Sequence, residues 1–350
     1  MNRAIALGLL LLLPACASSP SLRANRAAPS PGVVGAASTT SPALAVEPWT
    51  FNGRVGQAIT TPSYRIFTTQ RDTPLADRLP GFMEASLANY TTAIAPLPPP
   101  RRRLDFYVLS NRAEWARLTR DLLGEERASR YLHIERGGFS DDARAVLFNI
   151  GLHDTLAIAA HEGWHQYTQS AFAEPLPAWL DEGLAAWMEG FRWDARRPDQ
   201  PLFLPWANIE RFDHLRAAWA RGQTVPLQTL LESRPEDLIR ASSDGTLTYY
   251  SQVWALAHFL NEGDEGRYRN AMRRLLLDAA EGRMRRAVQA HLGQRAARSA
   301  VMRRTGPEVF LTYFDDDLDA VSRRYADFID RLVATGAKDR IIAGRSPVEP

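Results

Sequence analysis

The 350-residue sequence is short of cysteine, of lysine and of long apolar runs. Its single cysteine, Cys16, excludes a disulfide within the chain and a zinc site built from four cysteines. An apolar run over residues 4–13 is about half of the 20 residues that a membrane-spanning helix needs. Only Lys338 among the 42 basic residues is a lysine, and 40 acidic residues leave a net charge of +2. Because positive charge is not in excess, we expect no nucleic-acid partner.

The overall composition is that of an ordinary folded protein, with 45% apolar and 23% charged residues. At about 150 residues per domain, the chain has room for two domains or for one large domain with a long tail. A core of this size is stable without disulfides.

The start of the chain has the three parts of a secretory leader. A basic start with Arg3 precedes the apolar run, and Leu13-Pro14-Ala15-Cys16 resembles the lipobox of bacterial lipoproteins. We therefore predict that residues 1–15 are a lipoprotein signal peptide and that Cys16 carries a lipid anchor; an ordinary signal peptide and a buried free cysteine are the alternatives. The residue directly after Cys16 is Ala17 and not the aspartate that is associated with retention in the inner membrane. In a diderm bacterium this predicts a cell-envelope protein anchored in the outer membrane and facing the periplasm.

Composition also divides the rest of the chain. Residues 16–47 are mostly Ser, Ala, Pro, Gly and Thr, with almost no large apolar side chain. Such a stretch buries too little surface to offset its conformational entropy, so we predict a disordered tether. We expect an α+β part over 48–151, a helical part over 152–336 and a flexible tail over 337–350.

Apolar periodicity predicts strands in the first folded part and helices in the second. Strands are predicted over 64–68 and 104–109, helices over 75–94 and 114–123, and a hairpin joins 137–139 to 145–150. After residue 152 the pattern is almost entirely helical. Strands first and helices second indicate the α+β class, with an N-terminal mixed sheet and a mainly helical C-terminal half.

The motif with the clearest chemistry is His161-Glu162-Gly163-Trp164-His165, inside a predicted helix. Two histidines four residues apart lie one turn apart on the same helix face, where their imidazoles can chelate one zinc ion. Glu162 then lies where it can remove a proton from a zinc-bound water. The alternative is a helix with two ordinary histidines. A catalytic zinc site also needs a third protein ligand.

A second predicted helix contains the candidate for that ligand. Its sequence Pro177-Ala-Trp-Leu-Asp-Glu182-Gly-Leu-Ala, together with the His-Glu-x-x-His motif, resembles the gluzincin metallopeptidases of the peptidase MA-like group. The resemblance implies a zincin-like metallopeptidase fold. It also implies Zn²⁺ as the cofactor, with His161, His165, Glu182 and a water as its ligands.

The resemblance points to further residues around this site. Tyr250, with Tyr249 in reserve, begins a downstream helix and is expected to stabilise an oxyanion; a tyrosine that merely packs there is the alternative. Asp181 is a candidate hydrogen-bond partner for a ligand histidine, with solvent exposure as the alternative. An extended substrate is expected to pair with the strand that contains Val146 and Phe148, taken as an unpaired sheet edge.

Two classes of function remain. The first is a zinc-dependent peptidase of the cell envelope that hydrolyses peptide or protein substrates by metal-activated water. The alternative is a non-catalytic zinc-binding envelope lipoprotein that acts in binding or assembly. The presence of Glu162 favours the enzyme, because a binding module needs metal ligands but has no use for a base.

Overall fold

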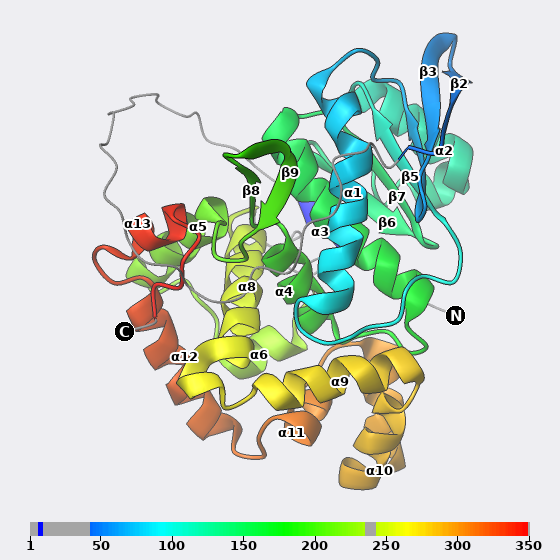
Figure 1. Ribbon diagram of the computed structural model, residues 1–350. Coiled ribbons are helices and arrows are strands. Elements are labelled where there is room, and N and C mark those ends of the chain that lie inside the picture. The colour runs from blue at the N-terminus through cyan, green and yellow to red at the C-terminus, as the bar shows by residue number, and fades with distance from the viewer. Residues whose placement is uncertain (1–5, 10–42, 235–242, 349–350) are drawn as a thin grey trace.

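The computed structural model describes residues 6–9, 43–234 and 243–348. Figure 1 shows a mixed sheet on one side of the molecule and helices that make up most of the rest. The predicted α+β class is confirmed, with the sheet in the N-terminal part and helices in the C-terminal half. Cys16 and most of the predicted tether lie outside the described residues. Within the described ranges, no helix is both long and apolar enough to cross a membrane.

Seven strands form the main sheet, in the order β1-β6-β7-β5-β4-β3-β2. The pairs β4–β5 and β5–β7 are parallel and the other neighbours are antiparallel, so the sheet is mixed. Strands β4 and β5 and the β6–β7 hairpin lie where the sequence predicts them. The bounds are β1 (Ala6–Leu9), β2 (Ala45–Phe51), β3 (Arg54–Thr60), β4 (Tyr64–Thr68), β5 (Leu104–Leu109), β6 (Gly137–Asp141) and β7 (Arg144–Phe148).

The folded part begins earlier than the sequence indicates. β2 starts at Ala45, inside the predicted tether, and pairs with β3 along its whole length. Its side chains are mostly exposed, so apolar periodicity does not reveal it. The limit of residue 47 for the tether is therefore wrong. β1 lies within the predicted signal peptide and pairs antiparallel with β6, Ala6 opposite Ser140 and Leu9 opposite Gly137.

The helices follow the predicted pattern, with one interruption. A two-stranded sheet, β8 (Phe191–Asp194) and β9 (Arg197–Phe203), lies in the half that was expected to be helical. Its strands are short and partly exposed, which weakens their pattern. The helices are α1 (Pro74–Thr92), α2 (Arg112–Ala128), α3 (Leu152–Ala171), α4 (Ala178–Met188), α5 (Ile209–Ala220), α6 (Leu227–Glu232), α8 (Ser243–Gly266), α9 (Arg269–Glu281), α10 (Met284–Arg303), α11 (Glu308–Tyr313), α12 (Leu318–Leu332) and α13 (Ala337–Ile342).

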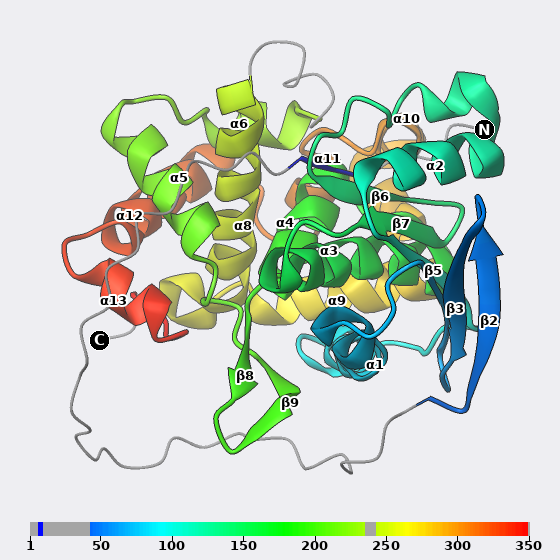
Figure 2. The same cartoon turned by 90° about the horizontal axis from the view of Figure 1, so that it is seen from above.

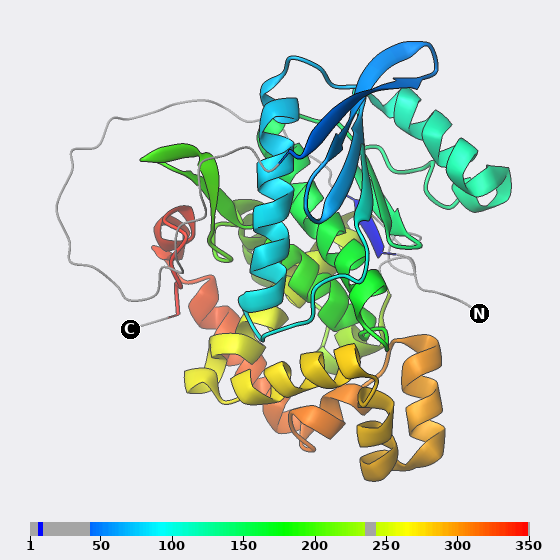
Figure 3. The ribbon, with the colours of Figure 1, turned by 45° about the vertical axis from the view of Figure 1, so that its right-hand side comes forward.

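The two faces of the main sheet carry different helices. Figure 2 shows α1 and α3 on one side of the central strands and α2 on the other. Alternate residues of β7 follow this division: Ala145 and Leu147 join the large core with α1 and α3, whereas Val146 and Phe148 pack with Trp115 of α2. In Figure 3 the β2–β3 hairpin and the helices α9 to α11 lie at opposite ends of the molecule.

β7 is a central strand, which corrects the predicted substrate strand. It is hydrogen-bonded to β5 on one side and to β6 on the other. Val146 and Phe148 are buried against α2, on the face of the sheet away from α3. The prediction that substrate pairs with these residues is wrong, because neither edge of the strand is open.

The C-terminal segment is also more ordered than predicted. Helix α13 lies within residues 337–350, where a flexible tail was expected, and it packs against α5. Ile341 is fully buried, and Lys338 Nζ lies 2.6 Å from Asp213 Oδ2. The expectation is therefore wrong for this helix, whose six residues are too few to show a helical period.

Candidate metal centre

Helix α3, which carries the His-Glu-x-x-His motif, is held from two sides. The Tyr90 hydroxyl of α1 donates a hydrogen bond to Ala160 O at 2.7 Å. Gly163 leaves room for this contact, since a Cβ there would lie 2.6 Å from the Tyr90 hydroxyl oxygen. From the sheet, the Ser140 hydroxyl of β6 donates to Glu162 O at 2.7 Å. The glycine of the motif therefore has a packing role, and α3 is fixed against both α1 and β6.

Helix α4 carries Glu182 and approaches α8 closely. Gly183 makes this approach possible, because a Cβ on it would lie 2.5 Å from Val253 O and 3.5 Å from Ala257 Cβ. The helix begins after Pro177, as the sequence predicts, and is buried along almost its whole length. The glycine that follows the glutamate thus determines how deeply α4 sits and where the carboxylate lies.

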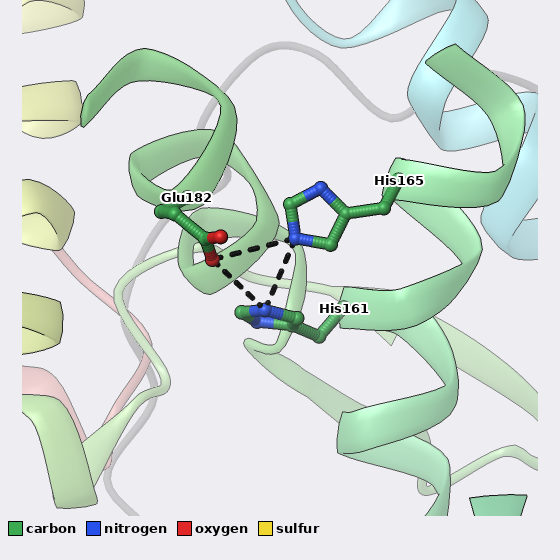
Figure 4. A group of neighbouring side chains, drawn as sticks. All are labelled: His161, His165 and Glu182. Carbon is green, nitrogen blue, oxygen red and sulfur yellow. Dashed lines mark hydrogen bonds and ion pairs between the residues drawn. The ribbon is translucent and has the colours of Figure 1, made fainter. Parts of the chain in front are cut away.

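His161, His165 and Glu182 come together as a buried group able to hold a metal ion (Figure 4). The two Nε2 atoms of the histidines are 3.3 Å apart, and each lies 3.4 Å from Glu182 Oε2. Ligand atoms of a tetrahedral zinc site with bonds of about 2.0–2.1 Å are about 3.3–3.4 Å apart. The three atoms therefore have the spacing of one face of a zinc tetrahedron. Glu182 Oε2 is buried without a hydrogen-bond donor among the described residues, which fits a ligand atom.

The other ring nitrogen of His165 faces Asp181. His165 Nδ1 lies 3.3 Å from Asp181 Oδ1, which also accepts a hydrogen bond from Trp164 Nε1 at 3.0 Å. Arg304 Nη2 donates to Asp181 Oδ2 at 2.7 Å. Burial would raise the pKa of Asp181, but His165 and Arg304 outweigh it and lower the pKa to about 2. Asp181 is buried beside a candidate ligand, so the alternative of solvent exposure is wrong.

His161 also has a carboxylate partner, Glu189. His161 Nδ1 lies 2.8 Å from Oε1 of Glu189, which follows α4 and is seven positions after Glu182. Arg211 of α5 donates to both Glu189 oxygens, at 2.7 and 3.1 Å, and Asn208 donates to Oε2 at 2.7 Å. Burial would raise the pKa of Glu189, but Arg211 and His161 lower it to about 2. The spacing places Glu189 on the right helix face, whereas its partners from α5 carry no recognisable sequence signal.

The buried site has an excess of negative charge. Four carboxylates face two guanidinium groups, so with neutral imidazoles the net charge is −2, which one divalent cation would balance. Burial would lower the pKa of both histidines, but the neighbouring carboxylates outweigh it and raise both values. The pKa of His165 lies well above its usual range. The imidazoles therefore tend to carry protons wherever no cation is bound. The charged residues are Glu162, Asp181, Glu182, Glu189, Arg211 and Arg304.

Glu162 differs from Asp181 and Glu189 in having no hydrogen-bond donor among the described residues. Its side chain is fully buried, and neither carboxylate oxygen has a hydrogen-bond donor among the described residues. Burial raises the pKa of Glu162, while His161 and His165 act in the opposite direction. A buried carboxylate without a donor is costly, and such groups occur at catalytic sites and beside bound ions or waters.

Tyr250 of α8 lies beside the candidate ligands. Its ring centroid is 6.1 Å from that of His161, and the Arg211 guanidinium carbon is 5.1 Å from the centre of its ring. The ring of Tyr249 packs against Tyr250 at 5.8 Å. This placement supports Tyr250 as the first choice of the two tyrosines, and its role in chemistry stays a prediction.

Comparison with known proteins identifies no family for this chain. No protein-family model matches the chain, and no curated protein is significantly similar to it. What the site can do is therefore inferred from its own donor atoms, charges and distances.

Proposed function

We propose that the protein is a zinc-dependent peptidase of the gluzincin type with a zincin-like fold. The observation that carries the proposal is the triangle of His161, His165 and Glu182 at zinc spacing, next to the buried and unpartnered Glu162. Three protein ligands from imidazole and carboxylate leave a fourth position for water or substrate, which is typical of catalytic zinc sites. Carboxylate partners on both histidines support the same interpretation, because they orient the rings and fix the tautomer.

The chain's own residues would perform the proton transfers. Bound Zn²⁺ supplies a Lewis acid and lowers the pKa of water toward neutrality. Glu162 acts as the general base that accepts a proton from water and then passes it to the leaving amine. Its raised pKa makes the carboxylate a stronger base than an exposed glutamate. The Tyr250 hydroxyl is our candidate donor to the developing oxyanion.

We place the substrate on the outer edge of β6 and no longer on β7. The antiparallel pairing of β1 with this edge, Gly8 opposite Gly138, supports this placement. β6 also lies against α3, through the bond from Ser140 to Glu162 O. Removal of the predicted signal peptide would leave the edge open for an extended peptide.

One substitution separates catalysis from metal binding. Glu162→Gln keeps the size of the side chain and all three metal ligands, so we expect the zinc content of wild type and no hydrolysis of a mixed peptide library. The matched variant His165→Ala should lose both zinc and activity. Substantial cleavage by Glu162→Gln would show that Glu162 is not the base. If wild type holds zinc firmly and cleaves nothing, the non-catalytic zinc-binding lipoprotein replaces the peptidase.

We further propose that the protein is lipid-anchored at Cys16 in the outer membrane, with the folded part in the periplasm. The support is the lipobox-like sequence at residues 13–16. Fractionation of cells that express Cys16→Ser tests the anchor. The variant should remain unprocessed, and normal processing with equal membrane association would argue against lipidation.

A further inference from the structure

Arg304 joins the C-terminal helices to the metal centre. It ends α10 in the left-handed conformation, with φ of 55°. Its side chain donates from Nε to Leu176 O and from Nη2 to Asp181 Oδ2, both at 2.7 Å. Its carbonyl oxygen accepts a hydrogen bond from Ala178 N, also at 2.7 Å. Three hydrogen bonds thus attach the end of α10 to the start of α4.

These bonds determine which way the carboxylate of Asp181 is turned. Because Arg304 donates to Oδ2, the other oxygen, Oδ1, is left to accept from Trp164 Nε1, and it lies 3.3 Å from His165 Nδ1. His165 is in turn held with Nε2 toward His161 and Glu182. A continuous path of contacts therefore leads from α10 to a candidate metal ligand.

An arginine is the residue that suits this position. Its planar fork donates in fixed directions, here to a backbone carbonyl and to a carboxylate at the same time. A lysine would retain the positive charge but would present a single donor atom in place of the fork. The charge and the geometry of Arg304 can therefore be tested separately.

We propose that Arg304 is a positioning residue for the metal centre, and that it couples metal binding to the docking of the end of α10 on α4. The inference rests on the proposed metal site and does not depend on peptidase activity. Removing a direct partner of a metal ligand lowers metal affinity by about 10–100-fold, and Arg304 acts through such a partner, Asp181, so this range is the upper limit for its removal. Because coupling is reciprocal, bound metal should also hold the end of α10 more firmly on α4.

The test is zinc affinity of the full-length protein, measured by competition with a chelator, together with the visible spectrum of the Co²⁺-substituted protein. Arg304→Met should bind zinc more weakly than wild type, by at most about 100-fold, and should give an altered cobalt spectrum. Arg304→Lys should fall between Arg304→Met and wild type, and it serves for the comparison if Arg304→Met does not fold. The control is Arg303→Met. The side chain of Arg303, the neighbour of Arg304, is exposed, so this variant should keep the zinc affinity and the cobalt spectrum of wild type.

A double-mutant cycle shows whether Arg304 acts through Asp181. If it does, combining Arg304→Met with Asp181→Asn should weaken zinc binding no more than Asp181→Asn alone. Wild-type affinity and spectrum in both Arg304 variants, or fully additive effects in the cycle, would overturn the inference. Zinc binding without peptide cleavage would refute the proposed function and leave these outcomes intact, whereas a wild type without zinc would refute both.

Discussion

Replacing Gly183 with alanine should weaken the fold and the metal centre together. The added Cβ would lie 2.5 Å from Val253 O, although real contacts of this kind stay above 3.0 Å. Val253 O is backbone of α8, so α4 must shift by about 0.5 Å, the difference between these distances. Overpacking of this kind costs about 1–3 kcal/mol. A zinc site tolerates ligand displacements of only about 0.2 Å, so the adjacent Glu182 should bind the ion more weakly.

Gly81 in α1 offers a matched control, because a Cβ there would meet nothing within 4 Å. Gly81→Ala should stabilise the protein by about 0.5–1 kcal/mol, since alanine is favoured inside a helix. Calorimetry in the presence of a chelator should show opposite shifts in Tm for the two variants, at about 2–4 °C per kcal/mol. Zinc affinity should fall in Gly183→Ala alone. A Gly183→Ala protein with the Tm and zinc affinity of wild type would refute the role of this close approach.

Three further predictions concern stability and rate. Without metal, the pairs that Asp181 and Glu189 form with the two histidines should raise Tm most between about pH 4.5 and 6.5. Asp181 and Glu189 have pKa values of about 2, below their usual 3.8 and 4.5, so their stabilisation is lost as the pH falls from about 4.5 toward 2. The two candidate ligand histidines have raised pKa values, so their stabilisation is complete below pH 6.5 and is lost as the pH rises further. Calorimetry across this range checks the maximum, and a metal-free Tm that keeps rising above pH 6.5 would contradict it. Ile341→Ala in α13 should lower the free energy of unfolding by about 2–5 kcal/mol, because this side chain is fully buried. The control Ile342→Ala, at the exposed neighbour, should change Tm little. Equal Tm values for the two variants would favour a flexible tail. Tyr250→Phe should lower kcat by about 10²-fold at unchanged zinc content, and an unchanged kcat would exclude the oxyanion role.

Local patterns in the sequence predict elements well where one face is buried. The predicted helix over 75–94 is observed as α1 (Pro74–Thr92), and the apolar stripe that indicates it is buried, including Phe82 and Tyr90. The strands over 64–68 and 104–109 have the bounds predicted. The same local reasoning places two histidines on one face of α3 and a glutamate on α4, which the structure brings together.

The misplaced substrate strand had a signal in the sequence. Residues 145–148 are apolar without alternation, and strands covered on both faces have this pattern. An edge strand exposed to solvent would alternate more clearly. The contacts that support the candidate metal ligands have no such signal in the sequence. Arg304 and Asp181 are 123 positions apart, and no local pattern pairs them. Arg211 and Glu189 likewise meet only through the packing of α5 on the core.

Helix α4 and the residue that follows it supply three of the carboxylates at the candidate metal centre. Glu182 is the proposed third ligand, and the carboxylates of Asp181 and Glu189 lie beside the two candidate histidine ligands. Residues 161–189 therefore contain all three proposed protein ligands and the two carboxylates that lie beside the histidines. This stretch is a two-helix unit that could be transferred to another helical scaffold. The recipient would have to supply the close-packed helix opposite Gly183 and two arginines in the places of Arg211 and Arg304.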